Sequence, residues 1–260
     1  MSEIHELLAG LGVGLVGGLT SGFMGTSPGG GLVIFSVLLL GAEQHVAQGT
    51  SLIAQIPPTG LAGVRRYWQS GNHSPLAWIV WIGVGFLAGG ISGGYAAAAV
   101  SDSFLQWTYA LYLVALLAAL ALRGEKKDGT GEADDRRELP WLPLLLIGML
   151  AGFSSGFMGI GGGLAITVGL AAGLRVPQHQ AQLVSLMFSV IPTNIPSAWI
   201  YWSKGLMAGW PAIIGIVAGL WVGTDLGARL ANGVSKQLLR QMMIGFVSLM
   251  ALFMTYKALN

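Results

Sequence analysis

The chain has 260 residues, of which 53% are hydrophobic and only 9% are charged, against about 25% charged in a typical soluble domain. A water-facing surface needs more charge than this, which excludes a disordered chain and argues strongly against a soluble enzyme. Cysteine is absent and glycine is abundant, with 41 residues. The composition therefore predicts a polytopic membrane protein without disulfides or thiolate chemistry.

Apolar segments long enough to cross a bilayer, about 20 residues each, recur along the chain. In order they cover 4–24, 46–66, 76–99, 104–122, 141–159, 181–202, 206–229 and 237–257. Two shorter stretches, 30–41 and 162–173, have the length of re-entrant or half helices. We expect an all-α membrane protein in which each half has about four full spans and one short helix next to a glycine-rich break.

The charged residues are concentrated in one segment. Of the 24 charged residues, 11 lie at 123–138, and such a run is typical of a solvated linker. We expect a first membrane repeat over 1–122, a charged linker over 123–140 and a second membrane repeat over 141–260.

The two halves repeat each other in sequence. The first half contains SGFMG (21–25), GGGL (29–32), HVAQGTSL (45–52), PT (58–59) and YWQSG (67–71), and the second contains SGFMG (155–159), GGGL (161–164), HQAQLVSL (179–186), PT (192–193) and YWSKG (201–205). The matched motifs keep one constant offset, except that the first half has two extra residues between SGFMG and GGGL. Duplicated membrane halves are typical of secondary transporters, whose binding site lies at the repeat interface.

The distribution of basic residues favours halves of inverted orientation. With five crossing elements in each half, 11 Lys and Arg fall inside and 2, Lys204 and Lys257, fall outside. With four elements, the halves run parallel and the division is 9 to 4. Because basic residues collect on the cytoplasmic side, the first arrangement is preferred, and it places the linker in the cytoplasm.

The repeated glycine motif is the sharpest candidate for a binding site. Three consecutive glycines disfavour a continuous helix, at roughly 1 kcal/mol each. A helix that starts after Gly31 or Gly163 presents free N–H groups and a positive dipole end, which together bind anions without a charged side chain. The alternative is close helix packing through small residues. The candidate substrate-binding residues of this motif are Ser27, Gly29, Gly30, Gly31, Gly161, Gly162 and Gly163.

A second set of polar residues follows in each half. These residues are Gln48, Thr50, Ser51 and Thr59 in the first half, and Gln182, Ser185, Thr193 and Asn194 in the second. Prolines at 57, 58, 192 and 196 should loosen the backbone hydrogen bonds nearby. The hydroxyls and amides either bind oxyanion oxygens or bond neighbouring helices.

Other polar and aromatic residues have simpler interpretations. His45 and His179 are equivalent in the repeat and fit an interfacial role better than a proton relay or a metal site. Asp225 and Arg229 are spaced i,i+4 and predict an ion pair. The pairs Tyr67–Trp68 and Tyr201–Trp202 are typical of an aromatic belt at the membrane interface.

Together these motifs resemble the sulfite exporter TauE/SafE family of membrane permeases. The resemblance is carried by GFMGTSPGGGL (22–32) and GFMGIGGGL (156–164), supported by QGTSL (48–52), AQLVSL (181–186) and the two Tyr-Trp segments. It implies transport of small anions that mostly contain sulfur. The first half departs from the usual GIGGG pattern by Ser27, Pro28 and two extra residues.

We therefore expect a multi-pass protein of the inner or plasma membrane that exports a sulfur oxyanion, above all sulfite or an organosulfonate, by alternating access. Its partners are the anion and the lipid bilayer, with no nucleic acid and no cofactor. Proton coupling and a homodimer stay open. The alternatives are an anion channel and a membrane-embedded serine hydrolase, although the sequence contains no Walker A or HExxH motif.

Overall fold

The computed structural model describes residues 3–24, 27–58, 61–69, 71, 73–122, 139–232 and 236–259, and these contain helices and no strand. The first half contains α1 (Glu3–Met24), α2 (Gly29–Leu39), α3 (Gln44–Ala54), α4 (Leu61–Gln69), α5 (Leu76–Ala97) and α6 (Asp102–Leu122). The second half contains α7 (Trp141–Met158), α8 (Gly163–Val168), the π-helix η1 (Gly169–Gly173), α9 (Gln178–Met187), α10 (Ile195–Ser203), α11 (Trp210–Asn232) and α12 (Lys236–Leu259). The charged residues of the expected linker, 123–138, lie outside the described part.

Four of the helices are long and apolar enough to cross a membrane. These candidate spans cover Glu3–Gly22, Leu76–Ala97, Trp141–Met158 and Trp210–Gly227. Large apolar side chains such as Leu76, Leu150 and Ile214 are exposed on them, where lipid rather than water would be the favourable solvent. The described part of the chain is all-helical, and its long apolar helices indicate a multi-pass membrane protein.

Two of the expected spans are each interrupted near their middle. The prediction of one helix over 46–66 is wrong, because α3 ends at Ala54 and α4 begins at Leu61. The prediction over 181–202 is also wrong, because α9 ends at Met187 and α10 begins at Ile195. Prolines lie in or beside both interruptions, and a proline removes an amide donor and clashes with the preceding helical turn.

The two short apolar stretches form short helices, as predicted. The first stretch is α2, and the second is α8 followed by η1. At 1.5 Å per residue, the 11 residues of α2 span about 16 Å, which is half the bilayer core of about 30 Å. Neither short helix is therefore long enough to cross the bilayer by itself.

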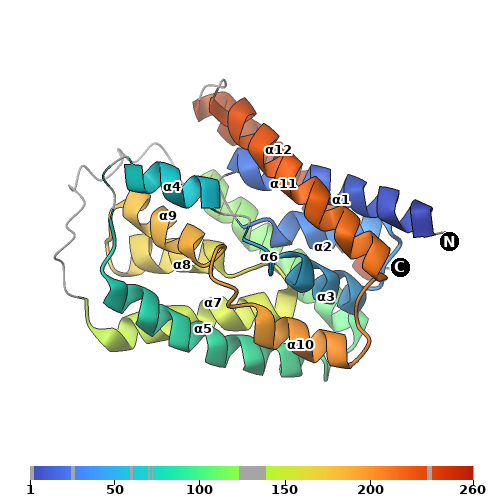
Figure 1. Cartoon of the computed structure of the whole chain (residues 1–260), viewed down its shortest axis with the longest axis horizontal. Helices are drawn as coiled ribbons and strands as arrows, with labels where there is room; N and C mark the ends of the chain where they lie inside the picture. The colour runs from blue at the N-terminus through green and yellow to red at the C-terminus, as the bar shows by residue number, and fades with distance from the viewer. Residues whose placement is uncertain are drawn as a thin grey trace.

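The long helices pack in two pairs through their backbones, at glycines spaced four residues apart. In the α1–α11 pair, β-carbons added at Gly14 and Gly18 would meet the carbonyls of Ile216 and Leu220. In the α5–α7 pair, β-carbons at Gly85 and Gly89 would meet the carbonyls of Leu145 and Met149. Residue numbers rise together along each pair, so the paired helices run parallel. Each pair joins one helix of the first half to one of the second (Figure 1).

The α5 helix also relates the positions of α3 and α9. The first turn of α3 lies at the C-terminal end of α5, where His45 Nε2 is 2.9 Å from the carbonyl oxygen of Ala97. The first turn of α9 lies near the N-terminal end of α5, where the Gln180 side-chain amide donates to the carbonyl of His73 at 2.9 Å. Since α3 and α9 carry equivalent segments of the repeated sequence, these equivalent helices start at opposite ends of α5.

The glycine contacts predict a sharp difference between two neighbouring substitutions on α1. Gly14→Ala should lower the free energy of unfolding by about 1–3 kcal/mol, because the methyl group would strike the α11 backbone. Gly12→Ala is the matched control, since its nearest contact would be 3.8 Å away at Leu39. Thermal unfolding in detergent measures both variants. Equal stability of the two would contradict the packing described here.

Candidate functional site

The two glycine-rich breaks lie in the interior of the helix bundle. Helix α2 folds back on α1, so that Gly31 lies against Gly17 and the Thr20 hydroxyl. Helix α8 folds back on α7, and a β-carbon at Gly162 would meet the Ala151 carbonyl and the Phe86 ring. Both of these neighbours lie near the middle of their helices, α7 and α5. The start of α8 is therefore at mid-depth in the bundle.

The two breaks, one from each half, touch each other. Gly29 packs against the backbone of Ile160, and Gly161 packs against the Ser27 hydroxyl. A β-carbon at Gly163 would lie 3.2 Å from Cβ of Ser27. The repeated glycine motifs of the two halves therefore meet in the interior of the bundle.

Hydrogen bonds from α3 connect the two breaks. The Ser51 hydroxyl lies 2.8 Å from the carbonyl oxygen of Gly159 and 3.3 Å from that of Gly29. The Gln55 amide donates to Ser51 Oγ at 3.0 Å, and its Oε1 accepts from the Ser27 hydroxyl at 2.9 Å. Ser51 of α3 and Gln55, which follows the end of α3, thus hold both breaks in place.

One hydrogen bond of this network is repeated in the second half. Ser185, which is the equivalent of Ser51 in the repeated sequence, donates to the carbonyl of Gly163 at 2.7 Å. Gly163 is the first residue of α8, just as Gly29 is the first residue of α2. Each half therefore fixes the start of its short helix by the same serine-to-carbonyl bond.

The short helices present free amides where the breaks meet. The first helical hydrogen bond of α2 runs from the Leu32 amide to the Pro28 carbonyl, and that of α8 from Ile166 to Gly162, both at 3.0 Å. Amides earlier in each helix have no intrahelical partner, and the helix dipole makes this end positive. The expectation that α2 starts after Gly31 is wrong, because Gly29–Gly31 form its first turn.

The glycines just before α8 have a different role from those of α2. Gly159 and Gly161 both have φ near +70°, a conformation that side chains disfavour. They allow the chain to turn sharply from α7 into α8. Gly161 and Gly162 consequently precede α8, and Gly163 is its first residue.

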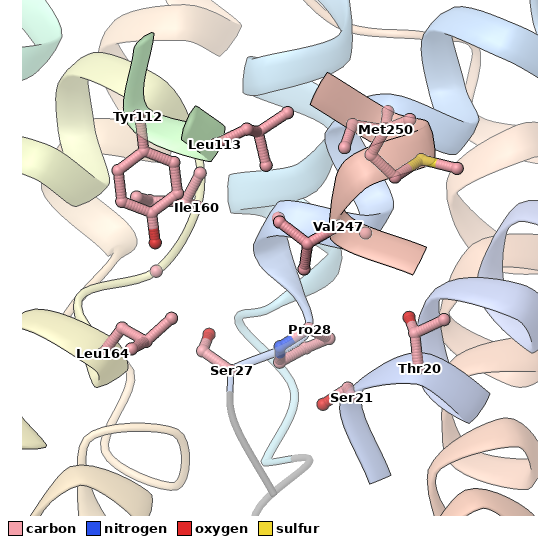
Figure 2. Close-up of a pocket in the computed structure, with 14 residues that line it drawn as sticks. Thr20, Ser21, Ser27, Pro28, Tyr112, Leu113, Ile160, Leu164, Val247 and Met250 are labelled. Atoms are coloured by element: carbon pink, nitrogen blue, oxygen red, sulfur yellow. The ribbon is translucent and has the colours of Figure 1, made fainter. Parts of the chain in front are cut away.

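Two cavities border the contact between the breaks. The larger, of about 60 Å³, is lined by Ser27, Gly30, Gly31 and Gly161 together with residues of α6 and α12 (Figure 2). The smaller, of about 10 Å³, is lined by Gln55, Ser185, Ser189 and Asn194. A water needs roughly 10–15 Å³ on this measure, so only the larger cavity has room for a small anion. None of the described residues that line either cavity is charged.

Most of the sequence-predicted site residues lie at these cavities. Ser27, Gly30, Gly31, Gly161, Gly162, Gly163, Ser185 and Asn194 line one or both, and Gly29 and Ser51 are joined to them by the contacts given above. Gln48, Gln182 and Thr193 line neither cavity. Gln48 instead accepts a hydrogen bond from Tyr201 at 3.0 Å. Thr59, from the same polar set, lies outside the described residues.

The sequence analysis missed several residues at the cavities. Gln55 and Ser189 both line the smaller cavity, and they occupy equivalent positions in the two repeats. Gln55 lies one helical turn after Ser51, so helical spacing combined with the repeat would have identified both. The rings of Phe86 and Phe188 stack at 5.8 Å beside the same cavity, and no sequence pattern indicated this pair.

The structure confirms one of the remaining predictions for polar and aromatic residues and contradicts another. Asp225 and Arg229 form the predicted ion pair at 2.7 Å, and both side chains are exposed. His45 Nδ1 lies 2.7 Å from Asp102 Oδ1, so this histidine ties α3 to α6. The side chain of His179 lies outside the described part. Assigning Tyr201 to an exposed aromatic belt is wrong, because its side chain is fully buried.

Comparison with known proteins agrees with this architecture. A probable membrane transporter protein of Xylella fastidiosa (strain 9a5c) is 26% identical over 265 residues, covering 98% of this chain and 97% of the relative. The probable membrane transporter protein YdhB of Bacillus subtilis (strain 168) is 24% identical over 231 residues, covering 86% and 89%. No solved structure matches at a significant level.

The family model described as Sulfite exporter TauE/SafE matches residues 9–254, which is nearly the whole chain. Taken with its apolar helices and its transporter relatives, this match shows that the chain is a membrane transporter belonging to the sulfite exporter TauE/SafE family.

Proposed function

We propose that this transporter moves a small sulfur-containing oxyanion, above all sulfite, through a site between the two glycine-rich breaks. The observation that carries the proposal is the contact between the two breaks beside a cavity of about 60 Å³. The proposal adds a binding site to the family assignment, and both halves of the chain contribute to this site.

Backbone groups provide the attraction for the anion in this proposal. Gly30 and Gly31 belong to the first turn of α2 and line the cavity. A helix N-terminus carries about half a positive charge, and its amides donate directly to an oxyanion. Ser27, Ser51, Gln48, Gln182, Ser185, Thr193 and Asn194 remain candidate side-chain ligands, with Ser27, Ser185 and Asn194 supported by their positions at the cavities.

We further infer that the two halves, 1–122 and 141–260, form an inverted repeat. The support comes from α3 and α9, which carry equivalent sequence and start at opposite ends of α5. The parallel pairs α1–α11 and α5–α7 each combine one helix from either half. Inverted halves of this kind expose a shared site alternately by rocking of one half against the other.

In this inverted arrangement both termini lie outside and the linker 123–140 lies in the cytoplasm. The proposed location is the inner or plasma membrane. The support for this orientation is the positive-inside rule: 11 basic residues fall inside and 2 outside when each half is counted as five elements, with the short helices included although neither crosses the bilayer by itself. Proton coupling would be detected as dependence of transport on a pH gradient. A homodimer is a separate proposal, which a measurement of the mass of the protein complex in a detergent-free membrane mimetic tests.

An anion channel is the alternative that uses the same site. It would show flux far above a carrier's rate and no accumulation against a gradient. A serine hydrolase has less support, because both ring nitrogens of His45 face oxygen acceptors, Asp102 and the Ala97 carbonyl, rather than a serine.

Sulfite uptake into proteoliposomes of the purified chain tests the proposed function. We expect saturable flux that competing sulfur oxyanions inhibit, measured with and without a pH gradient. Liposomes without protein provide the background. Folded protein that moves neither sulfite, thiosulfate nor sulfoacetate would contradict the proposed function, and flux that does not saturate would favour the channel.

Gly30→Val tests the location of the site. A side chain at Gly30 would have room, since its nearest contact is 3.7 Å away at the Tyr109 hydroxyl, and it would occupy the cavity. We expect a folded protein with at least tenfold lower flux. Gly245→Val on α12 is the control, because a β-carbon there meets nothing within 4 Å.

Normal flux in Gly30→Val would place the substrate elsewhere. Gly162, which the repeated motif also suggests, is a poorer test position. A β-carbon there would lie 2.8 Å from the Ala151 carbonyl oxygen, so lost flux could reflect lost packing.

A further inference from the structure

The larger cavity has two chemically different ends. Leu113 from α6 and Val247 and Met250 from α12 lie together at one end, and all three are buried apolar residues (Figure 2). Ser27 lies at the other end, close to the first turn of α2. The ring of Tyr112 stands at the side, with its hydroxyl directed toward the Ser27 end. An anion in this cavity would meet donors on one side and only hydrocarbon on the other.

The hydroxyl of Tyr112 is a side-chain donor that this cavity offers to a ligand. Thr20 and Ser27 also line the cavity, but their hydroxyls donate to the Gly17 carbonyl and to Gln55 Oε1, both at 2.9 Å. Among the residues that the structure describes, the Tyr112 hydroxyl makes no hydrogen bond. Because Tyr112 lines the cavity, its hydroxyl can donate a hydrogen bond to an anion held there.

The helix that carries Tyr112 is fixed against the start of α2. Tyr109, one turn earlier on α6, donates to the Gly30 carbonyl at 2.7 Å. The rings of Tyr109 and Tyr112 lie 6.2 Å apart. This bond fixes α6 beside the first turn of α2, so that Tyr112, Gly30 and Gly31 line one cavity.

The repeat shows that this donor belongs to the first half alone. At the offset that relates Ser51 to Ser185, the equivalent of Tyr112 is Phe246 and the equivalent of Tyr109 is Met243. Leu113 and Val247 are equivalent in the same way, and both are apolar. The duplicated sequence therefore contributes hydrocarbon from both halves to one end of the cavity, but a phenol from only one half.

We propose that the Tyr112 hydroxyl binds the oxyanion head of the substrate, and that Leu113, Val247 and Met250 form an apolar end that accepts an uncharged substituent and excludes a second charge. This inference rests on the proposed function and deepens it. A carboxylate placed at the apolar end would lose its hydration without gaining hydrogen bonds. A methylene placed there would gain about fourfold in affinity, from about 0.8 kcal/mol of burial.

Competition against sulfite flux in proteoliposomes of the full chain tests the apolar end without any mutation. We expect ethanesulfonate to inhibit at about fourfold lower concentration than methanesulfonate. Sulfoacetate, which carries a second charge, should inhibit at least tenfold more weakly than ethanesulfonate. Equal inhibition by ethanesulfonate and sulfoacetate would overturn the inference while leaving the proposed function intact. Absence of any sulfite flux would instead defeat both.

Two substitutions test the two ends separately. Tyr112→Phe removes only the hydroxyl. It should raise the KM for sulfite and the inhibition constant of every competing anion about tenfold or more, the usual loss of a hydrogen bond to a charged group. The ratios between the inhibition constants should not change. Val247→Thr adds a hydroxyl at the apolar end. It should reduce the difference between the inhibition constants of sulfoacetate and ethanesulfonate.

Matched controls lie on exposed helix faces. Tyr95→Phe on α5 and Val222→Thr on α11 make the same chemical changes at residues that are 61% and 54% exposed. Both controls should keep the wild-type KM and the wild-type ratios. A KM for Tyr112→Phe equal to that of Tyr95→Phe, or an unchanged ratio in Val247→Thr, would overturn the assignment.

Discussion

Backbone-to-backbone contact at glycine is the constraint on which the rest of this structure depends. The two breaks touch where Gly29 meets the backbone of Ile160 and Gly161 meets Ser27. A side chain at either glycine would push the breaks apart. The parallel pairs α1–α11 and α5–α7 use the same principle, with glycines every fourth residue against carbonyls of the facing helix. Close approach also maximises van der Waals contact, which is the main attraction between helices in lipid.

The glycine contacts also explain how an apolar bundle offers an anion a site without basic residues. A charged side chain at the centre of a bilayer costs at least about 2.5–3.5 kcal/mol. Helix N-termini and hydroxyls avoid this cost, because they present permanent dipoles and carry no net charge. Such dipoles attract an oxyanion less strongly than an ion pair would, which suits a carrier that must also release its substrate.

The sequence analysis predicted the existence of most helices better than the contacts between them. The short helices after the glycines were predictable, because three glycines within an apolar segment disfavour a continuous helix. The serine bonds of Ser51 and Ser185 were suggested by the repeat, although the carbonyls that accept them were not. The break between α3 and α4 was missed because hydropathy is insensitive to a local gap that prolines and tertiary contacts create.

Contacts between the halves were the least predictable feature. Tyr201 looked like an interfacial residue, but it is buried and bonded to Gln48 of the other half. Tyr112 had no motif at all, because its importance arises only where α6 passes the start of α2. Periodicity describes one helix at a time, whereas a cavity depends on which helices become neighbours.

The most direct test of the central claim is a cross-link between the two breaks. The chain has no cysteine, so Ser27→Cys combined with Gly163→Cys introduces a single pair. The two β-carbons would lie 3.2 Å apart, close to the roughly 3.5–4.5 Å of a disulfide. We predict that mild oxidation in membranes forms an intrachain disulfide that lowers the transport of the double variant until it is reduced, and that neither single variant responds to oxidation in this way. Failure of the folded, active double variant to cross-link would contradict the meeting of the two breaks.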